Sequence, residues 1–458
     1  MEGTFDVRIF SIEPRKRKSG YTYRVVWTVN KRKHSETYPT KGQADGRRAE
    51  LKTAANNGVP FSTITGLPIT FASKAAEKGW YSFATEYVDW KWARSSGNSR
   101  KNVAKAMTAA TIALLRTQPS QFDPRDVRTA LREYAFNTKR RSSSLPDEVR
   151  EILNWVERNT LPMSAWEDTA KAEAVVAALG TLLDGTAAAA SSVTRNRRIM
   201  SLALDYAVKH NVLRTNPLTK IGKQDSAPRV GQAISKRSLL NPSQVAALLE
   251  WIGKRPRRGL LYQAFFATLC YAGLRPEEAV ALRVADATLP DSGWGEFIVH
   301  KAQPEVGSQW TDTGDVHEDR FLKGRAEGDT RTVPIHPDLV VLLRQIIAKY
   351  KLKPEGLLFP GEGGKTLAGS VFRRVWDKAR REVLTPHEYN SPAGKRVYDC
   401  RHTCLTGWLN AGIPPAQVAE WAGNSVPVLL AIYARCIVGQ LADYLKRIEE
   451  VRYLPVAA

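Results

Sequence analysis

The chain has 458 residues, of which 43% are hydrophobic and 25% are charged, so it can bury substantial cores and is not disordered as a whole. At a typical size of about 150 residues per domain, this length suggests about three domains. The 68 Lys and Arg residues exceed the 46 Asp and Glu residues, which leaves a formal net charge of +22. This excess favours a polyanionic partner, because cations that neutralise phosphates release condensed counterions.

The basic residues form separate clusters mixed with aromatic residues, as in EPRKRKSGYTYR and FRRVWDKARR. A merely solvated basic surface and binding to a membrane surface are the alternatives, but this clustering favours nucleic acid. We read no signal peptide at the start, MEGTFDVRIFSI. The most apolar long stretch, AVVAALGTLLDGTAAAASS, is interrupted by Gly180, Asp184 and Gly185 and falls short of a membrane span. We therefore expect a soluble protein of the cytoplasm, with no membrane partner.

The four cysteines show no CxxC spacing and no neighbouring His cluster. A disulfide framework and a zinc site are both disfavoured by this pattern. We expect reduced, mostly buried thiols and no metal.

Residues 5–40 alternate apolar and polar positions in three runs, FDVRIFSI, YTYRVVWTV and KHSETYP, separated by the basic stretches EPRKRKSG and NKRK. This period of two predicts a three-stranded antiparallel sheet with basic turns, and a helix should follow over KGQADGRRAELKTAANNG. We predict a DNA-contacting module over residues 1–65. Its candidate contacts are the cations of strands and turns: Arg15, Lys16, Arg17, Lys18, Arg24, Lys31, Arg32 and Lys33.

The pattern is helical over residues 73–221, which we predict to be a helical DNA-binding domain. Its last helix should carry an apolar stripe and stop at Pro217; the stripe comprises Ile199, Leu202, Tyr206 and Leu213. Arg195, Arg197 and Arg198 crowd the start of that helix, where contact with phosphate and a solvated helix face remain equal alternatives. The polar, Gly- and Pro-bearing residues 222–235 are the expected linker.

Residues 236–458 should form the last domain. Asn241 and Pro242 are expected at the cap and first turn of its first helix. The remainder is mostly helical, with one strand-rich interruption between about Trp294 and Ile335.

Four pieces of this last domain carry the residue types of a reactive site. CYAGLRPEEAVALR places Arg275 at a helix end, with Glu278 on the helix that follows. RFLKGRAEGDTRTVPIHP is read as a hairpin with Lys323 on one strand and RTVPI returning. YDCRH supplies Arg401 and His402, and VAEWAGNSVPVLLAIYARC presents Tyr433.

These pieces, in this order and with nine positions from Asn424 to Tyr433, resemble the tyrosine recombinase (phage integrase) family. The motif sequences most resemble those of integrases from temperate phages and integrative elements, and in particular those of actinobacteria. The resemblance extends over the rest of the chain, because the family commonly has a small sheet module for arm-type DNA sites and a helical core-binding domain. It implies a multidomain, mainly α protein with small β-sheets, ending in a mixed, mainly helical catalytic domain of tyrosine recombinase type.

The resemblance also implies roles for the matching residues. Arg275 and Arg401 would hold a DNA phosphate, since a planar guanidinium donates two hydrogen bonds and stays charged. Lys323 would protonate the leaving 5′ oxygen, and Tyr433 would become a 3′-phosphotyrosine. The energy of the cleaved phosphodiester is kept in the phosphotyrosine bond, so no cofactor is expected. In agreement, the sequence has no GxxxxGK[ST] nucleotide-binding motif.

Two positions depart from the usual family pattern, because Tyr398 and Asn424 stand where a His, or a His or Trp, is common. A tyrosine with a pKa of about 10 is a poor general base. We therefore expect Tyr398 and Asn424 to position the phosphate. His402 is a candidate to accept the proton of Tyr433, although in the family it more often supports the site.

Each assignment has a plain structural alternative. Arg275 could only pair with Glu278, Lys323 could be a solvated lysine with Arg325 as the rival cation, and Tyr433 could be a core aromatic residue four positions after Leu429. The order and spacing of the four pieces favour the catalytic roles.

The sequence thus predicts a site-specific recombinase that integrates, and in reverse excises, phage or mobile-element DNA. Its expected partners are double-stranded attachment sites of core and arm type, a homotetramer on DNA, a recombination directionality factor and a host DNA-bending protein. A non-catalytic DNA-binding regulator and a tyrosine-based topoisomerase are the rival interpretations. The regulator would not need these residues in this order, and the arm-like module argues against the topoisomerase.

Overall fold

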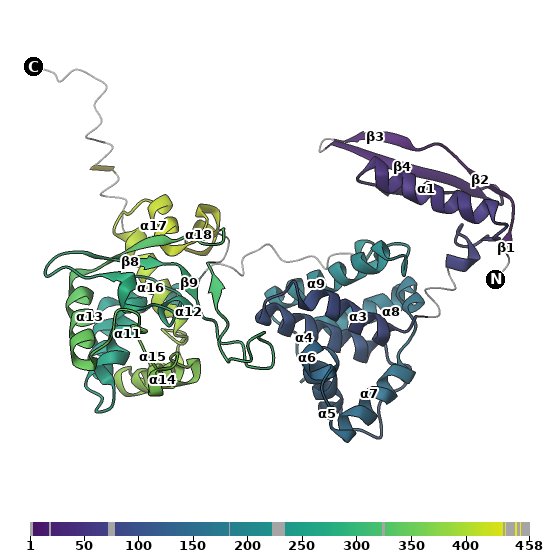
Figure 1. Ribbon diagram of the computed structural model, residues 1–458. Helices are drawn as coiled ribbons and strands as arrows, with labels where there is room; N and C mark the ends of the chain where they lie inside the picture. Colours follow the sequence, from purple (N-terminus) through teal and green to yellow (C-terminus); the bar gives the residue numbers. More distant parts are fainter. Residues whose placement is uncertain are drawn as a thin grey trace, which may run out of the picture. The chain divides into compact units, whose positions relative to one another are not determined.

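The computed structural model describes residues 3–17, 20–71, 78–182, 184–221, 234–322, 326–433, 436, 445–446 and 449. The chain divides into two compact units, Met1–Ser226 and Ala227–Ala458 (Figure 1). The prediction of a mainly helical chain with several small sheets is confirmed. The finer division of the first unit into residues 1–65 and 73–221 stays a prediction.

The first unit begins with a sheet packed against one helix (Figure 1). The long central strand β4 pairs with β2 and β3 along one edge and with β5 along the other. A separate two-stranded sheet joins β1 to β6. The bounds are β1 Gly3–Thr4, β2 Val7–Ile9, β3 Glu13–Arg17, β4 Gly20–Val29, β5 Arg32–Tyr38, α1 Lys41–Asn56 and β6 Phe61–Ser62.

The sheet has four strands where the sequence predicted three. The first predicted run forms β2, and the stretch after it that was predicted as a basic turn forms β3, so Arg15, Lys16 and Arg17 lie on a strand. The reason is the length of β4: its ten residues offer hydrogen bonds along the whole edge, and these are satisfied by a partner strand. The second turn is shorter than the predicted four-residue stretch NKRK: it consists of Asn30 and Lys31, both at positive φ as a two-residue hairpin turn requires, and Arg32 and Lys33 begin β5.

A bundle of helices follows. Trp80, Phe83, Tyr87 and Tyr206 form part of its aromatic core. The bounds are α3 Trp80–Trp92, α4 Gly97–Ala113, α5 Pro124–Thr129, the π-helical turn η1 Ala130–Ala135, α6 Thr138–Arg141, α7 Asp147–Asn159, η2 Met163–Glu167, α8 Thr169–Leu179, α9 Ala190–Lys209 and η3 Pro217–Thr219.

Two details of the last helix, α9, were predicted wrongly. It ends at Lys209, not at Pro217, because the chain turns at Asn211, whose φ is +59°. Pro217 instead opens η3. Its buried stripe also differs: Leu202 is exposed, and the inward positions are held by Met200, Ala203, Leu204, Tyr206 and Ala207.

The described part of the second unit combines helices with a three-stranded and a two-stranded sheet. Asn241 caps its first long helix through a capping box with Gln244, as predicted for this position. The bounds are η5 Lys236–Ser238, α10 Pro242–Gly253, α11 Gly259–Tyr271, α12 Pro276–Ala279, η6 Val284–Asp286, β7 Ala287–Thr288, β8 Gly295–Val299, β9 Lys301–Ala302, β10 Arg320–Phe321, β11 Arg331–Ile335, α13 Pro337–Tyr350, η7 Glu362–Gly364, α14 Gly369–Val383, α15 Pro386–Asn390, α16 Tyr398–Asn410, α17 Pro415–Ala422 and α18 Val426–Tyr433.

The strand-rich interruption is present, but its pairing is not the predicted hairpin. β11 pairs with β8, and β10 pairs with β9, so residues 320–321 and 331–335 lie one after the other along the same neighbouring chain segment. In this register Phe321 lies opposite Lys301 and Arg331 lies opposite Val299. The buried alternation of β8 and β11 explains the choice, because this pairing puts Phe297 and Val333 on the core face together.

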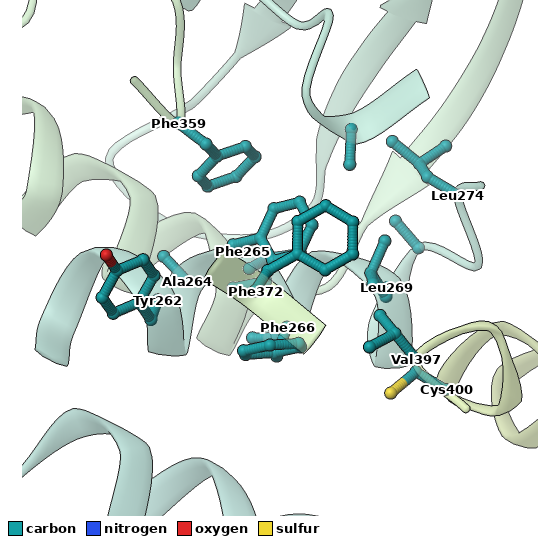
Figure 2. Close-up of a cluster of buried hydrophobic side chains, with 14 of the residues drawn as sticks. Tyr262, Ala264, Phe265, Phe266, Leu269, Leu274, Phe359, Phe372, Val397 and Cys400 are labelled. Atoms are coloured by element: carbon teal, nitrogen blue, oxygen red, sulfur yellow. The ribbon is translucent and has the colours of Figure 1, made fainter. Parts of the chain in front are cut away.

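Two of the predicted site residues, Arg275 and Arg401, directly follow residues of this unit's hydrophobic core. Figure 2 shows Leu269 of α11 close to Val397 and Cys400 at the start of α16, and Leu274 belongs to the same buried cluster. Leu274 and Cys400 are both fully buried. Arg275 and Arg401 each follow one of these anchored residues, so core packing fixes where their backbones stand.

All four cysteines are free thiols, and Cys400, Cys404 and Cys436 are buried. No helix in the described ranges is long and apolar enough to cross a membrane.

Candidate functional site

Tyr433, the last residue of α18, combines a buried ring with a polar contact at its hydroxyl. The side chain is 1% exposed and packs in a cluster with Leu405, Val418 and Leu429. Its hydroxyl oxygen lies 2.9 Å from Nδ1 of His402. Burial raises the pKa of the Tyr433 hydroxyl, while Arg401 opposes that rise. Tyr433 is therefore a core aromatic residue whose hydroxyl faces a cluster of polar groups.

His402 lies one turn into α16 and is 8% exposed. Burial lowers the pKa of its imidazole to about 4, against the opposing effect of Asp399. The ring is consequently neutral near pH 7, and a neutral imidazole has one nitrogen able to accept a hydrogen bond. His402 can thus accept a hydrogen bond from the Tyr433 hydroxyl.

Arg401 precedes His402 and is the most buried cation of this region, with 1% of its surface exposed. Its Nη1 and Nη2 donate to the carbonyl oxygens of Gly273 and Ala422. Its Nε is buried without a hydrogen-bond partner among the described residues. Burial, followed by the like charge of Arg275, lowers the pKa of Arg401, but a guanidinium remains charged at neutral pH.

Arg275 stands at the N-terminus of α12 and reaches two elements. Its Nη1 donates to Glu278 over 2.7 Å, which is the ion pair that the sequence offered as an alternative. Its Nη2 also donates to the Gly423 carbonyl over 3.0 Å and to Oδ1 of Asn424 over 2.8 Å. Arg275 therefore connects the start of α12 with the turn between α17 and α18, which leads to Tyr433.

Glu278 has a second partner that sequence reasoning missed. Arg331, the first residue of β11, forms two hydrogen bonds to its carboxylate, of 2.9 and 2.6 Å. Arg331 is 3% exposed and stands at an inward position of the strand, in phase with Val333 and Ile335. A charged residue in phase with the apolar positions of a buried strand was the available signal, because such a residue is seldom buried without a partner.

Tyr398 completes the cluster from the first position of α16. Its ring lies edge-on to His402, with 5.0 Å between ring centroids, and His402 is in turn edge-on to Tyr433 at 5.7 Å. Tyr398 also lies near Arg275 and Arg401. The structure therefore brings six of the seven predicted catalytic residues into one connected group: Arg275, Tyr398, Arg401, His402, Asn424 and Tyr433.

The seventh, Lys323, lies outside the described residues, as does its rival Arg325. The described chain stops at Leu322, after β10, and resumes at Ala326, five residues before Arg331. In the described ranges no group of three or more His, Cys, Asp or Glu side chains is placed to hold a metal ion.

The N-terminal sheet presents a second candidate surface. Residues opposite each other in antiparallel strands point to the same face, and Val25, Trp27 and Val29 of β4 face α1. The pairs Arg15 with Thr22, Arg24 with Glu13, and Lys33 with Thr28 must therefore point away from the helix. Arg8, opposite Thr28, joins them and was not among the predicted residues.

The remaining predicted cations of this module are distributed differently. Lys16 and Arg32 lie in phase with the helix-facing positions, and Lys31 is in the exposed hairpin turn. Arg17 lies on β3, while Lys18 is outside the described residues. The open face is thus defined by Arg8, Arg15, Arg24 and Lys33.

The three arginines of α9 are not equivalent. Arg197 donates to the carbonyl oxygens of Leu218 and Ile221, so it supports its own domain. Arg195 and Arg198 are exposed, and Arg195 contacts Ser192 on the same helix. Only the latter two retain the surface position that contact with phosphate would need.

Neither a protein-family model nor a curated protein matches the sequence. Among solved structures, the chain is similar to the Tn1549 transposon integrase in complex with transposon right end DNA, with 17% identity over 69% of this chain and 97% of that chain and a TM-score of 0.46. It is similar to the XerH site-specific recombinase bound to palindromic difH substrate in a post-cleavage complex, with 15% identity over 77% and 96% and a TM-score of 0.44. A lambda integrase dimer bound to a COC′ core site matches at 12% identity over 97% of each chain, with a TM-score of 0.45.

These three proteins are tyrosine recombinases, the family that the sequence motifs resemble. Identities of 12 to 17% and TM-scores of 0.44 to 0.46 are similarities of chain path alone. What this chain does is therefore inferred from the side chains of its own site.

Proposed function

We propose that this chain is a site-specific DNA recombinase of the tyrosine recombinase type, which cuts and rejoins DNA strands through a 3′-phosphotyrosine intermediate. One observation carries the proposal. The Tyr433 hydroxyl is hydrogen-bonded to a neutral, buried histidine and lies in the field of Arg275 and Arg401. A nucleophile, an adjacent proton acceptor and cations for the developing charge are the parts that transesterification at phosphorus needs.

In the proposed reaction the Tyr433 oxygen attacks the phosphorus of a DNA phosphodiester. A bond forms between this oxygen and phosphorus, and the bond from phosphorus to the 5′ oxygen breaks. The tyrosine proton passes to Nδ1 of His402, and the leaving 5′ oxygen takes a proton from Lys323, whose role rests on the motif resemblance. Rejoining reverses these steps when the 5′ hydroxyl of a second strand attacks the phosphotyrosine.

The orphaned Nε of Arg401 supports a phosphate at this place. An unpaired buried donor costs about 1–3 kcal/mol, and Arg401 already uses its other two nitrogens on backbone carbonyls. A nonbridging phosphate oxygen would satisfy this donor with a charge-assisted hydrogen bond. Because Tyr433 and Arg401 are each 1% exposed, α18 must shift before DNA can reach them.

Asn424 and Tyr398 take positioning roles in this scheme. Asn424 accepts a hydrogen bond from Arg275 and holds that guanidinium beside the turn before α18. Tyr398 borders His402 and can hydrogen-bond the phosphate through its hydroxyl. Neither is needed as the base, since His402 occupies that place.

The open face of the N-terminal sheet, with Arg8, Arg15, Arg24 and Lys33, is the proposed contact for arm-type DNA. Exposed Arg195 and Arg198 of α9 are proposed contacts for the core site. We further propose a homotetramer on two duplexes, working with a directionality factor and a host DNA-bending protein, that integrates and excises phage or mobile-element DNA in a bacterial cytoplasm.

The test uses duplexes that tile the DNA flanking the coding sequence, each nicked in one strand so that cleavage traps the covalent product. We expect a DNA-linked protein species on a denaturing gel with the wild type, and none with Tyr433→Phe, while both proteins retard the same duplexes on a native gel. A Tyr433→Phe variant that still forms the species would refute the assigned nucleophile.

The rival functions give different outcomes in the same experiment. A DNA-binding regulator would retard the duplexes without forming any linked species. A topoisomerase would relax supercoiled plasmids that lack the flanking DNA, whereas the proposed recombinase acts only where its own sites are present.

A further inference from the structure

Arg331 joins three elements of the candidate site through one buried guanidinium. From the start of β11 it forms two hydrogen bonds to the carboxylate of Glu278 in α12, of 2.9 and 2.6 Å. Its Nε donates to the carbonyl oxygen of Trp421 in α17 over 2.9 Å. With 3% of its surface exposed, this side chain makes its contacts inside the protein and is not placed to meet DNA itself.

The carboxylate that Arg331 holds is also the support of Arg275. Oε1 of Glu278 accepts from Nη1 of Arg275 over 2.7 Å, and Oε2 accepts from its backbone N–H over 2.9 Å. Each oxygen of Glu278 is thus shared between the two arginines. The orientation of the Arg275 fork toward Asn424 therefore depends on a carboxylate that Arg331 keeps in place.

The second route from Arg331 runs to the turn before Tyr433. Trp421 is two residues before Gly423, which ends α17 with a φ of +60°. A Cβ atom at Gly423 would come within 3.1 Å of Nη1 of Arg331. The turn that supplies the Gly423 carbonyl and Asn424 to Arg275 is consequently packed directly against Arg331.

We propose that Arg331 is a positioning residue for strand cleavage, which aligns Arg275 through Glu278 and aligns the turn before α18 through Trp421. This role rests on the proposed function.

The charge balance around Glu278 makes the role testable by pH. The charged groups that face its carboxylate are Arg275 beside its own helix, Arg331 from β11 and Arg401 from α16. Burial alone would raise the pKa of Glu278, but these cations, Arg331 foremost, hold it at about 2. Without Arg331 the burial effect gains weight, the pKa rises, and the carboxylate takes up a proton at a higher pH.

The test measures the rate of the DNA-linked species, and the affinity for the same nicked duplex, between pH 5.5 and 8.5. For Arg331→Met we expect a rate about 100-fold lower, since small misplacements of a catalytic group cost that much, with DNA affinity within about threefold because Arg331 is not placed to contact the duplex. The rate of Arg331→Met should fall further as the pH is lowered and Glu278 takes up a proton. In the wild type, Glu278 should cause no change in rate over this pH range.

Two further variants separate positioning from folding. Arg331→Met/Glu278→Gln removes one cation and one anion, so the net charge of the site is unchanged. This variant should be slow, but its rate should not fall at low pH through protonation of residue 278. Arg331→Lys should restore a pH-independent rate at an intermediate level, because it returns the charge without the two-pronged geometry.

Arg380→Met is the matched control. Arg380 is 2% exposed and donates to the carbonyls of Ala393 and Tyr389, so its loss should lower thermal stability and leave the cleavage rate and its pH profile unchanged.

Wild-type rate and a flat profile in Arg331→Met would overturn the positioning role while the proposed function stands. Absence of the linked species with the wild type would instead count against the proposed function. In that case a crystal structure of Arg331→Met still decides the point: we expect Arg275 Nη2 to leave Asn424, and an unchanged contact would overturn the proposal.

Discussion

Replacing His402 with phenylalanine removes the acceptor of the Tyr433 hydroxyl and keeps a ring of similar size. Because the phenol is buried, its hydroxyl would be left without a partner, which costs about 1–3 kcal/mol of the free energy of unfolding at pH 7. Loss of a general base lowers the rate of a proton-coupled step by about 10² to 10⁴. We therefore expect His402→Phe to fold with reduced stability and to form the DNA-linked species at least about 100-fold more slowly.

The wild-type histidine also predicts how stability changes with pH. Its pKa falls from 6.5 to about 4 on folding, so between these values the unfolded chain binds a proton that the folded chain does not. Stability from this group is present above pH 6.5 and is lost as the pH falls toward 4, by up to about 3 kcal/mol. The stability gap between wild type and His402→Phe should therefore narrow as the pH is lowered through this window.

The assays are chemical denaturation from pH 4 to 7.5 and single-turnover trapping on a nicked duplex from pH 5.5 to 8. His387→Phe is the matched control, because His387 is exposed on α15 and its loss should change neither measurement. Cleavage by His402→Phe within threefold of the wild type would refute the role of His402 as proton acceptor. A stability gap that stays constant with pH would refute the buried, neutral state of the ring.

Three further predictions follow from the contacts of the second unit. Arg401→Lys should lower the cleavage rate by about 10² to 10³, as loss of one preorganised donor does, because a single ammonium cannot hold two carbonyls and a phosphate; the native-gel affinity should change far less. Gly423→Ala should lower the free energy of unfolding by about 1–3 kcal/mol in a thermal melt, since the residue has a φ of +60° and its Cβ would press on Arg331, and an unchanged melting temperature would contradict the turn geometry. Asn241→Ala should cost about 0.5–2 kcal/mol through loss of its helix cap, while the rate per folded molecule stays at the wild-type value.

Local features of this protein could be predicted from the sequence because they depend on neighbouring residues. Asn241 and Pro242 carry the capping preferences of a helix start, and the helix forms there. The three runs with period-two alternation form strands β2, β4 and β5 of the N-terminal sheet. The four motifs also named six residues that the structure brings together, because each motif is read directly from the residues, whereas Lys323 lies outside the described residues.

Only the tertiary structure decided which side chains meet across elements. His402 and Tyr433 are 31 residues apart and touch because α16, α17 and α18 pack on one another. Arg331 reaches Glu278 because β11 pairs with β8 and not with β10. No local sequence pattern predicts either contact, because the His402–Tyr433 contact depends on helix packing and the Arg331–Glu278 contact on strand register.

The same cause explains where the sequence misled. Proline at position 217 is a stop signal, yet α9 had already ended at Lys209, where the chain turns at Asn211. The basic stretch after Glu13 has the composition of a turn, yet it forms strand β3 because it pairs with the edge of β4. Sequence composition reports what each segment tolerates, whereas hydrogen-bonding partners and core contacts from elsewhere in the chain decide which of the tolerated states is adopted.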